Sequence, residues 1–297
     1  MLPFRPIDIS DKHNADAILK EQNSFLCAHC FVDLFIWKVK YDTQICIQNG
    51  FLFVKQMLDE TTVYTVPLGS GDLKNAIELL KKDAIYRNVE FNISAVNENQ
   101  KLEIEKIMPD KFDFTEERDS EDYLYLAESL ITLAGKKLHS KRNFINRFKE
   151  FYDDRWIYEN ISADNIHEVF NYHLSWCAQN AEGDSDEFLG ETCAISAALN
   201  NFEALNLKGG LLRVDGEVIA FTLGSRATSD MFIVHIEKAD YTIAGAYQII
   251  NNQFAIHNFD DVKYINREED MGKEGLRKAK LSYYPALMGL NFTGYPK

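Results

Sequence analysis

The sequence predicts an α/β (α+β) protein in which mixed β-sheets are flanked by helices. Two observations support this prediction. Helical stretches alternate with short strand-like runs, and a similar order of elements runs twice along the 297 residues. The length agrees with two domains, because cores much larger than about 150 residues tend to split. With 46% apolar and 26% charged residues, the composition is that of an ordinary globular protein.

The first half predicts a domain over residues 1–128. Asn49-Gly50 between two apolar runs is a strong hairpin signal, and Asp72 stands where the N-cap of a helix belongs. The expected elements are, in order, helices at 11–20 and 27–39, strands at 44–48, 51–57 and 61–66, a helix after 72, a strand at 90–95, a helix at 99–107 and a strand at 123–126.

The second half predicts a domain over residues 129–297. Asp164 stands at a helix start, and Asp215-Gly216 is a second hairpin signal. The expected elements are a helix after 164, a helix at 188–205, strands at 211–214, 218–224 and 231–237, a helix at 245–256, a strand at 262–266 and a helix at 275–281. Two helices, three antiparallel strands, a helix, a strand and a last helix is the order of an acyltransferase domain of the GNAT type.

Charge and cysteine usage exclude several classes of protein. The net charge of −14 argues against a general duplex-DNA coat or a polybasic membrane-surface protein, since both need cationic surface. The start of the chain lacks the pattern of a signal peptide, and its most apolar stretch, 25–37, is too short to span a bilayer. Five scattered cysteines suit reduced thiols, and Cys27 and Cys30 lack a second pair for a metal. We therefore expect a cytoplasmic protein without a metal site or an integral membrane segment.

A basic stretch stands out against this acidic background. Residues 136–149 contain six Lys or Arg and no acid. Such a stretch binds phosphates through charge-assisted hydrogen bonds. The alternative is the solvated face of a helix at 142–152, whose apolar face would contain Phe144, Ile145, Phe148 and Phe151. The sequence leaves both interpretations open.

The start of the helix at 245 bears on the acyl donor. In acyl-CoA-dependent acyltransferases, a loop of the form Gln/Arg-x-x-Gly-x-Gly/Ala cradles the pyrophosphate at this helix N-terminus. Aligned on Gly245, this chain has Thr242 in place of Gln or Arg and Tyr247 in place of the last small residue. A tyrosine would block the close approach of a pyrophosphate to the backbone. The pattern therefore disfavours a coenzyme A site.

A dense alternation of acids and bases follows the predicted strand at 262–266. Three acids, Glu268, Glu269 and Asp270, lie beside Arg267. Such neighbours raise the pKa of one carboxyl group and lower that of another, which is how a general base is made. A surface loop laced with ion pairs is the alternative interpretation.

Three stretches, Gly135 to Asn146, His235 to Asp240 and Tyr264 to Pro285, closely resemble the family of the phosphatidylglycerol lysyltransferase C-terminal domain. The resemblance implies two tandem GNAT-like domains, as in the Fem aminoacyltransferases. It also implies transfer of an aminoacyl group from aminoacyl-tRNA to an amine or hydroxyl, without a covalent enzyme intermediate. The lipid-modifying members carry a multispanning membrane part that is absent from these 297 residues, so the acceptor stays open among small molecules, peptides and lipids.

This chemistry needs a base, oxyanion donors and a phosphate clamp. The candidates are Glu237 and Glu269 as the base, Arg267 as an electrophilic partner and Tyr283 as proton donor to the leaving oxygen. The candidate substrate-binding residues are Lys136, Lys137, His139, Lys141, Arg142, Asn143, His235, Lys238, Gly245, Tyr247, Asn266, Asp270, Arg277 and Lys280.

No further cofactor is expected, because aminoacyl-tRNA, bound in a local basic groove, would be the donor. Two alternatives remain. The first is an N-acyltransferase that uses acetyl-CoA or another acyl-CoA. The second is a non-catalytic ligand-binding module on a GNAT fold, against which the ionisable triplet Glu237, Arg267 and Glu269 counts.

Overall fold

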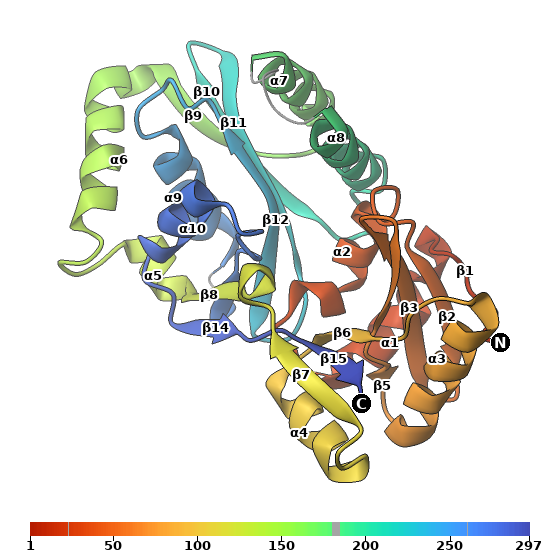
Figure 1. The fold of residues 1–297 in the computed structure, drawn as a ribbon. Coiled ribbons are helices and arrows are strands. Elements are labelled where there is room, and N and C mark those ends of the chain that lie inside the picture. Colours follow the sequence, from red (N-terminus) through yellow and green to blue (C-terminus); the bar gives the residue numbers. More distant parts are fainter. Residues whose placement is uncertain (23, 180–184, 260) are drawn as a thin grey trace. The chain divides into compact units, whose positions relative to one another are not determined.

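The computed structural model describes the chain except residues 23, 180–184 and 260, and only the backbone at 21, 179 and 185–187. The chain forms two compact units (Figure 1). The first contains Met1–Asp122, Glu269–Lys273 and Met288–Lys297, and the second contains Tyr123–Glu268 and Glu274–Leu287. In the described part of the chain, no helix has both the length and the apolar character needed to cross a membrane.

The first unit is built on an eight-stranded mixed sheet in the order β1-β2-β3-β4-β6-β15-β7, with β5 paired to β3. Among the residues that the structure describes, only β4 and β6 of this sheet pair in parallel. Its strands are β1 (Arg5–Pro6), β2 (Gln44–Gln48), β3 (Phe51–Leu58), β4 (Thr61–Thr65), β5 (Leu68–Gly69), β6 (Ile93–Val96), β7 (Phe112–Glu116) and β15 (Phe292–Pro296). Its helices are α1 (Lys12–Gln22), α2 (Phe31–Ile36), α3 (Leu73–Arg87) and α4 (Glu98–Ile107), with short 3-10 turns at Ile9–Asp11, Cys27–His29 and Arg118–Ser120.

Local signals place most of these elements. Asn49 and Gly50, with φ of 53° and 80°, form the tight turn that joins β2 to β3. The Asp72 carboxylate accepts a hydrogen bond of 2.9 Å from the Asn75 N–H and caps α3. The helix expected at 27–39 is wrong in extent: a 3-10 turn precedes α2, which ends at Ile36.

The second unit is built on a seven-stranded mixed sheet in the order β14-β8-β13-β12-β11-β10-β9. Its strands are β8 (Asp122–Leu126), β9 (Trp156–Asn160), β10 (Lys208–Val214), β11 (Glu217–Arg226), β12 (Met231–Ala239), β13 (Tyr264–Asn266) and the edge strand β14 (Leu287–Gly289). Its helices are α5 (Ala127–Thr132), α6 (His139–Tyr152), α7 (Ile166–Gln179), α8 (Ser185–Asn200), α9 (Ala246–Asn258) and α10 (Glu274–Leu281), with a 3-10 turn at Asp153–Arg155.

Strands β12 and β13 pair in parallel, and this pair opens partway along its length. Pairing runs from Met231 opposite Tyr264 to Ile233 opposite Asn266, and β12 then continues to Ala239 beside β11 but without β13. A bulge at His235 accompanies the opening, because Leu223 and Gly224 of β11 pair with Ile236 and Val234. Strands β10, β11, β12 and β13 lie side by side in this one sheet.

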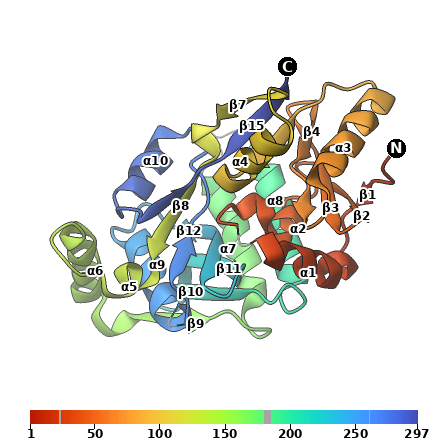
Figure 2. The same cartoon turned by 90° about the horizontal axis from the view of Figure 1, so that it is seen from below.

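The two compact units alternate along the chain. We predicted continuous domains on either side of residue 128, whereas the last strand, β15, lies between β6 and β7 of the first unit, alongside β7 in Figure 2. The segment Glu269–Lys273 also belongs to the first unit. Strand pairing across almost two hundred residues leaves no local sequence signal, so this exchange was not foreseen.

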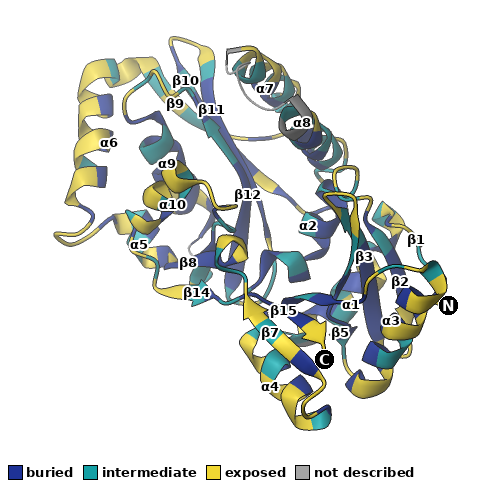
Figure 3. Ribbon diagram, viewed as in Figure 1, coloured by how far each residue is buried: buried dark blue, intermediate teal, exposed yellow. Residues whose placement is uncertain are grey.

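Helix α6 buries only part of the apolar face that the sequence suggested. Ile145 and Phe148 are buried as expected, and Lys141 joins them. Phe144 and Phe151 are 43% and 71% exposed, so the apolar face named in the solvated-helix interpretation is only partly buried. Figure 3 shows a largely exposed helix with a narrow buried stripe.

Candidate functional site

An ion pair occupies the opening between β12 and β13. Glu237 stands on the part of β12 that β13 no longer accompanies, and Arg267 follows the last residue of β13. Arg267 Nη2 lies 2.8 Å from Glu237 Oε1, with both side chains largely buried. Asn251 of α9 donates a hydrogen bond of 3.0 Å from Nδ2 to the other carboxylate oxygen of Glu237. The sequence candidates Glu237 and Arg267 are therefore brought together.

Two tyrosine rings flank the Arg267 guanidinium, whose central carbon lies 4.9 Å from the ring centre of Tyr283 and 5.7 Å from that of Tyr125. Burial is the largest single influence on the pKa of Arg267 and lowers it. The charge of Glu237, the two tyrosines and the hydrogen bond to Glu237 together outweigh burial, so this pKa lies above its ordinary value. Burial also raises the pKa of both tyrosines, which keeps their hydroxyls protonated at neutral pH.

Two polar atoms of this cluster are buried without a hydrogen-bond partner among the described residues, namely Arg267 Nη1 and Asn251 Oδ1. A carboxylate only accepts hydrogen bonds, so the amide nitrogen of Asn251 must face Glu237 and its oxygen must face away. Buried polar groups in folded proteins are normally paired. A ligand that accepts from Arg267 and donates to Asn251 would satisfy both atoms.

Lys280 supports the turn that carries Arg267. Its buried ammonium donates hydrogen bonds to the carbonyl oxygens of Arg267 and Glu268, the second at 3.0 Å. Glu268 has a φ of 57°, and its N–H donates to Asn266 Oδ1 at 2.6 Å. Lys280 and Asn266, which the sequence suggested as substrate-binding residues, thus hold the main chain of this turn.

His235 is the residue that the bulge displaces, and it is buried. Its Nδ1 lies 2.8 Å from Glu268 Oε1, and its Nε2 lies 2.8 Å from Ser225 Oγ. The imidazole therefore links the bulge of β12 to the turn after β13.

The basic stretch 136–149 reaches the candidate site at Tyr283. Lys141 Nζ donates a hydrogen bond of 2.6 Å to Ser282 Oγ and lies 4.1 Å from the ring centre of Tyr283. Burial, and then the charge of Arg267, lower the pKa of Lys141 to about 8.

The other candidate residues of the basic stretch 136–149 lie mostly at the surface. Lys136, Lys137, His139 and Asn143 are exposed. Arg142 donates to the carbonyl oxygens of Leu133 and Gly135, the second at 2.9 Å, and so fixes the loop before α6.

The start of α9 differs from a pyrophosphate cradle. Gly245 has a φ of 94°, and a Cβ there would lie 2.9 Å from the Phe144 carbonyl oxygen. The Asp240 carboxylate accepts hydrogen bonds from the N–H of Thr242 at 2.8 Å and from its hydroxyl at 2.6 Å. Burial raises the pKa of Tyr247. Gly245 thus permits close packing of α6, and an internal carboxylate already lies at the loop, which disfavours a phosphate there.

Lys238 points to the opposite side of β12 from Glu237, as neighbours in a strand do. Its ammonium lies 2.7 Å from Glu191 of α8 and 3.7 Å from the ring centre of Trp176 of α7. Sequence reasoning missed Glu191, Trp176, Tyr125 and Asn251. A signal existed for Asn251, because the polar run Asn251-Asn252-Gln253 stands between the apolar residues Ile249, Ile250 and Phe254 of the predicted helix.

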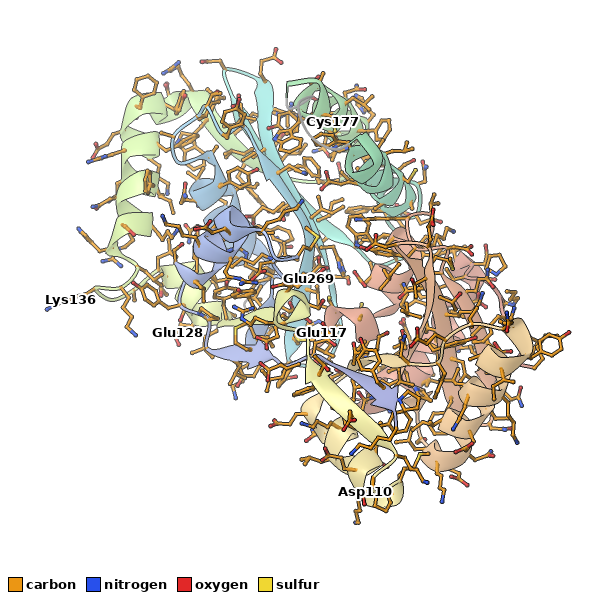
Figure 4. All side chains as sticks on the ribbon, viewed as in Figure 1. Asp110, Glu117, Glu128, Lys136, Cys177 and Glu269 are labelled. Atoms are coloured by element: carbon orange, nitrogen blue, oxygen red, sulfur yellow. The ribbon has the colours of Figure 1, made fainter. Side chains whose placement is uncertain are left out.

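The candidates Glu269 and Asp270 belong to the first unit and not to the unit that contains the Glu237–Arg267 pair. Glu269, labelled in Figure 4, belongs to the first unit, where Cys27 Sγ donates to its Oε2 at 3.5 Å. Ligand atoms of Cys27, Asp122 and Glu269 lie within 4.8 Å of one another. Asp270 is buried, pairs with Arg118 at 3.4 Å and accepts from the Gly272 N–H at 2.9 Å, so it anchors its own segment.

Arg277 is half-buried on α10 in the second unit. Of the four catalytic candidates, Glu237, Arg267 and Tyr283 therefore form one cluster in the second unit, and Glu269 lies in the first.

Comparison with protein families gives one match over most of the chain. The family described as phosphatidylglycerol lysyltransferase, C-terminal, matches residues 20–290. An uncharacterised protein of Mycoplasmoides gallisepticum is 30% identical over 168 residues, which are 56% of this chain. The aligned region spans only 53% of that relative, about half of its length.

Solved structures resemble the whole fold. A conserved protein of unknown function from Bacteroides thetaiotaomicron is 40% identical, with a TM-score of 0.94 and complete coverage of both chains. The C-terminal domain of a putative lysylphosphatidylglycerol synthetase from Agrobacterium fabrum is 12% identical, with a TM-score of 0.66, over 96% of this chain and 91% of the other. FemX is 9% identical, with a TM-score of 0.61, over 100% and 98%. The predicted α/β fold of tandem GNAT-like type is confirmed.

Proposed function

Because the chain belongs to the family of phosphatidylglycerol lysyltransferase C-terminal domains, we propose that it transfers an aminoacyl group from aminoacyl-tRNA to an amine or hydroxyl acceptor. The observation that carries the proposal is the buried Glu237–Arg267 pair, in which one arginine nitrogen faces no protein partner among the described residues. A buried donor of this kind is what an oxyanion site requires.

The proposed reaction assigns one role to each group of the cluster. The acceptor oxygen or nitrogen attacks the ester carbonyl carbon of the donor, and Glu237 takes the proton that the acceptor loses. The carbonyl oxygen becomes an oxyanion, which Arg267 Nη1 stabilises by hydrogen bonding. The ester bond to the tRNA ribose then breaks, and the leaving oxygen takes a proton from Tyr283, whose hydroxyl is protonated. Solvent returns the proton to Tyr283 and removes the one on Glu237.

The ion pair also sets what Glu237 does before the reaction. Arg267 and Asn251 each donate a hydrogen bond to one carboxylate oxygen of Glu237, so the orientation of this carboxylate is fixed. An acceptor that binds Asn251 Oδ1 would reach the carboxylate in this geometry. Glu269 is the second candidate for the base, and separate variants distinguish the two.

The arrangement at α9 supports aminoacyl-tRNA over an acyl-CoA donor. The Asp240 carboxylate at the Thr242 N–H would repel a pyrophosphate. We therefore expect coenzyme A to bind weakly or not at all. A micromolar affinity in calorimetry would reverse this preference and favour the acyl-CoA-dependent reaction.

The test is a transfer assay with tRNA charged by a mixture of labelled amino acids and a panel of amine and hydroxyl acceptors. We expect Glu237→Gln to reduce transfer by roughly 10²-fold or more, the usual range for a lost general base, and to leave tRNA binding intact. The matched control is Glu159→Gln, which removes a carboxylate 2.6 Å from Arg213 in the same sheet. Full transfer by Glu237→Gln together with a loss in Glu269→Gln would move the base to Glu269.

A further inference from the structure

One flank of α6 presents aromatic rings to solvent. Phe144 and Phe151 are 43% and 71% exposed, while Ile145 and Phe148 occupy the buried stripe. The spacings of three, four and seven residues place Phe144, Arg147 and Phe151 on the same side of the helix. Arg147, which is also exposed, therefore stands between the two rings. The two phenylalanine rings are therefore exposed to solvent, although the neighbouring side chains of Ile145 and Phe148 are buried.

The charge before and between these rings is positive, whereas the exposed acids Glu150, Asp153 and Asp154 lie beside Phe151. The stretch 136–149 carries six bases and no acid, although the chain has a net charge of −14. Lys136, Lys137, Arg147 and Lys149 of this stretch are exposed. Acidic polymers and surfaces are the partners that complement such a region.

Rings combined with bases are typical of surfaces that bind unpaired nucleotides, where bases stack on aromatic faces and cations contact phosphates. With a rise of 1.5 Å per residue, Phe144 and Phe151 stand about 10 Å apart along the helix. One strand of a duplex advances roughly 3.4 Å per phosphate, and an unpaired strand stacked with a similar rise would cover this distance with about three nucleotides. Arg147 lies midway, where a backbone phosphate would pass.

A membrane surface fits these observations less well. An interfacial helix inserts one continuous apolar face into the bilayer, opposite its charged face. In α6 the continuous apolar face, Ile145 and Phe148, is buried within the protein. The remaining rings are separated by Arg147, so charge and apolar surface are mixed on the same flank.

We infer that the flank of α6 formed by Phe144, Arg147 and Phe151 binds unpaired nucleotides by stacking, and so gives the protein a preference for single-stranded over duplex nucleic acid. The inference rests on the proposed use of tRNA and deepens it, since it names the part of the nucleic acid that the protein grips. The same helix also carries Lys141, which contacts Tyr283 of the candidate site.

The experiment measures fluorescence anisotropy with a short labelled single-stranded RNA of mixed sequence and with the same RNA annealed to its complement. The variants are the Phe144/Phe151 double substitutions to Ala, to Leu and to Tyr. We expect the wild type to favour the single strand. Both the Ala and the Leu variants should lose roughly tenfold or more in affinity for it, and the Tyr variant should keep it, because only rings stack. Tyr86→Ala, which removes an equally exposed ring from α3, is the matched control and should bind as wild type.

Two results would overturn the inference. Unchanged binding by the Ala variant would mean that the rings do not contact RNA. If the wild type and the Leu variant bind phosphatidylglycerol vesicles and the Ala variant does not, while RNA affinity is unchanged in the Leu variant, the flank is a membrane surface instead. Measuring RNA binding and aminoacyl transfer separately, in the wild type and in Glu237→Gln, distinguishes this inference from the proposed function. If RNA binding depends on the rings but no protein, wild type included, transfers an aminoacyl group, the transfer reaction is refuted and the stacking is not. If the wild type transfers an aminoacyl group but RNA binding is unchanged in the Phe144/Phe151 variants, the stacking is refuted and the transfer reaction is not.

Discussion

The ammonium of Lys141 lies 4.1 Å from the ring centre of Tyr283, and the Arg267 guanidinium lies 4.9 Å from the same centre. One tyrosine ring thus contacts two cations from segments more than a hundred residues apart. Neither cation is fully solvated, and the charge of Arg267 contributes to lowering the pKa of Lys141. This relationship connects the basic helix α6 to the Glu237–Arg267 pair.

The first prediction concerns the pH dependence of stability through Lys141. Its pKa of about 8 in the folded protein lies below the ordinary value of 10.5. Between these values the unfolded chain binds more protons than the folded one, so the free energy of unfolding should rise with pH from about 8 to 10.5 through this group. Urea unfolding at several pH values should show that Lys141→Met lacks this rise. Lys136→Met, at an exposed position, should retain it; an identical pH profile for both variants would contradict the assignment.

The second prediction concerns the buried ion pair. Arg267→Ala leaves the largely buried Glu237 carboxylate without its cation, which typically costs about 3–5 kcal/mol of unfolding free energy. Arg155 pairs with Asp215 at the surface, with side chains 46% and 55% exposed. Arg155→Ala should therefore cost at most about 1 kcal/mol. Equal losses in denaturant unfolding would show that Glu237 is hydrated in the folded protein.

The third prediction separates backbone strain from packing at two glycines with similar φ. Gly245, at 94°, has no room for a Cβ beside Phe144, whereas Gly216, at 87°, has open space. Both alanine variants should lose about 1 kcal/mol from the left-handed conformation, and Gly245→Ala should lose more because α6 must shift. Thermal unfolding measures the difference. Equal stability of the two variants would mean that α6 does not pack closely on the start of α9.

The fourth prediction concerns the phosphate contacts of the basic stretch. If exposed lysines bind RNA, replacing Lys136 and Lys149 with Ala should reduce the number of phosphates contacted by about two. The log–log salt slope should then become shallower by about 1.4, equally for all sequences. Lys40→Ala, an exposed lysine of the first unit, is the control. An unchanged slope in the double variant would leave the stretch as a solvated helix face.

Some of the fold was predictable because its information is local. Asn49-Gly50 and Asp72 act on residues within a few positions of themselves, and the elements they border lie where expected. The extent of the helix expected at 27–39 was not predictable in this way, since a 3-10 turn at Cys27–His29 replaces its beginning. There, contacts made by buried side chains outweigh helical spacing.

The sequence by itself determined the class of the fold, the order of strands at 210–266 and the residue types of the candidate site, because periodicity, turns and motifs are written in neighbouring residues. Only the tertiary structure decided that β15 completes the first sheet, that Phe144 and Phe151 face water, and that Lys280 supports a turn. It also decided that Glu237 pairs with Arg267 while Glu269 belongs to the other unit. The physical reason is that strand pairing and burial depend on residues distant in the chain. The residues next to a given position do not specify which distant residue it will contact.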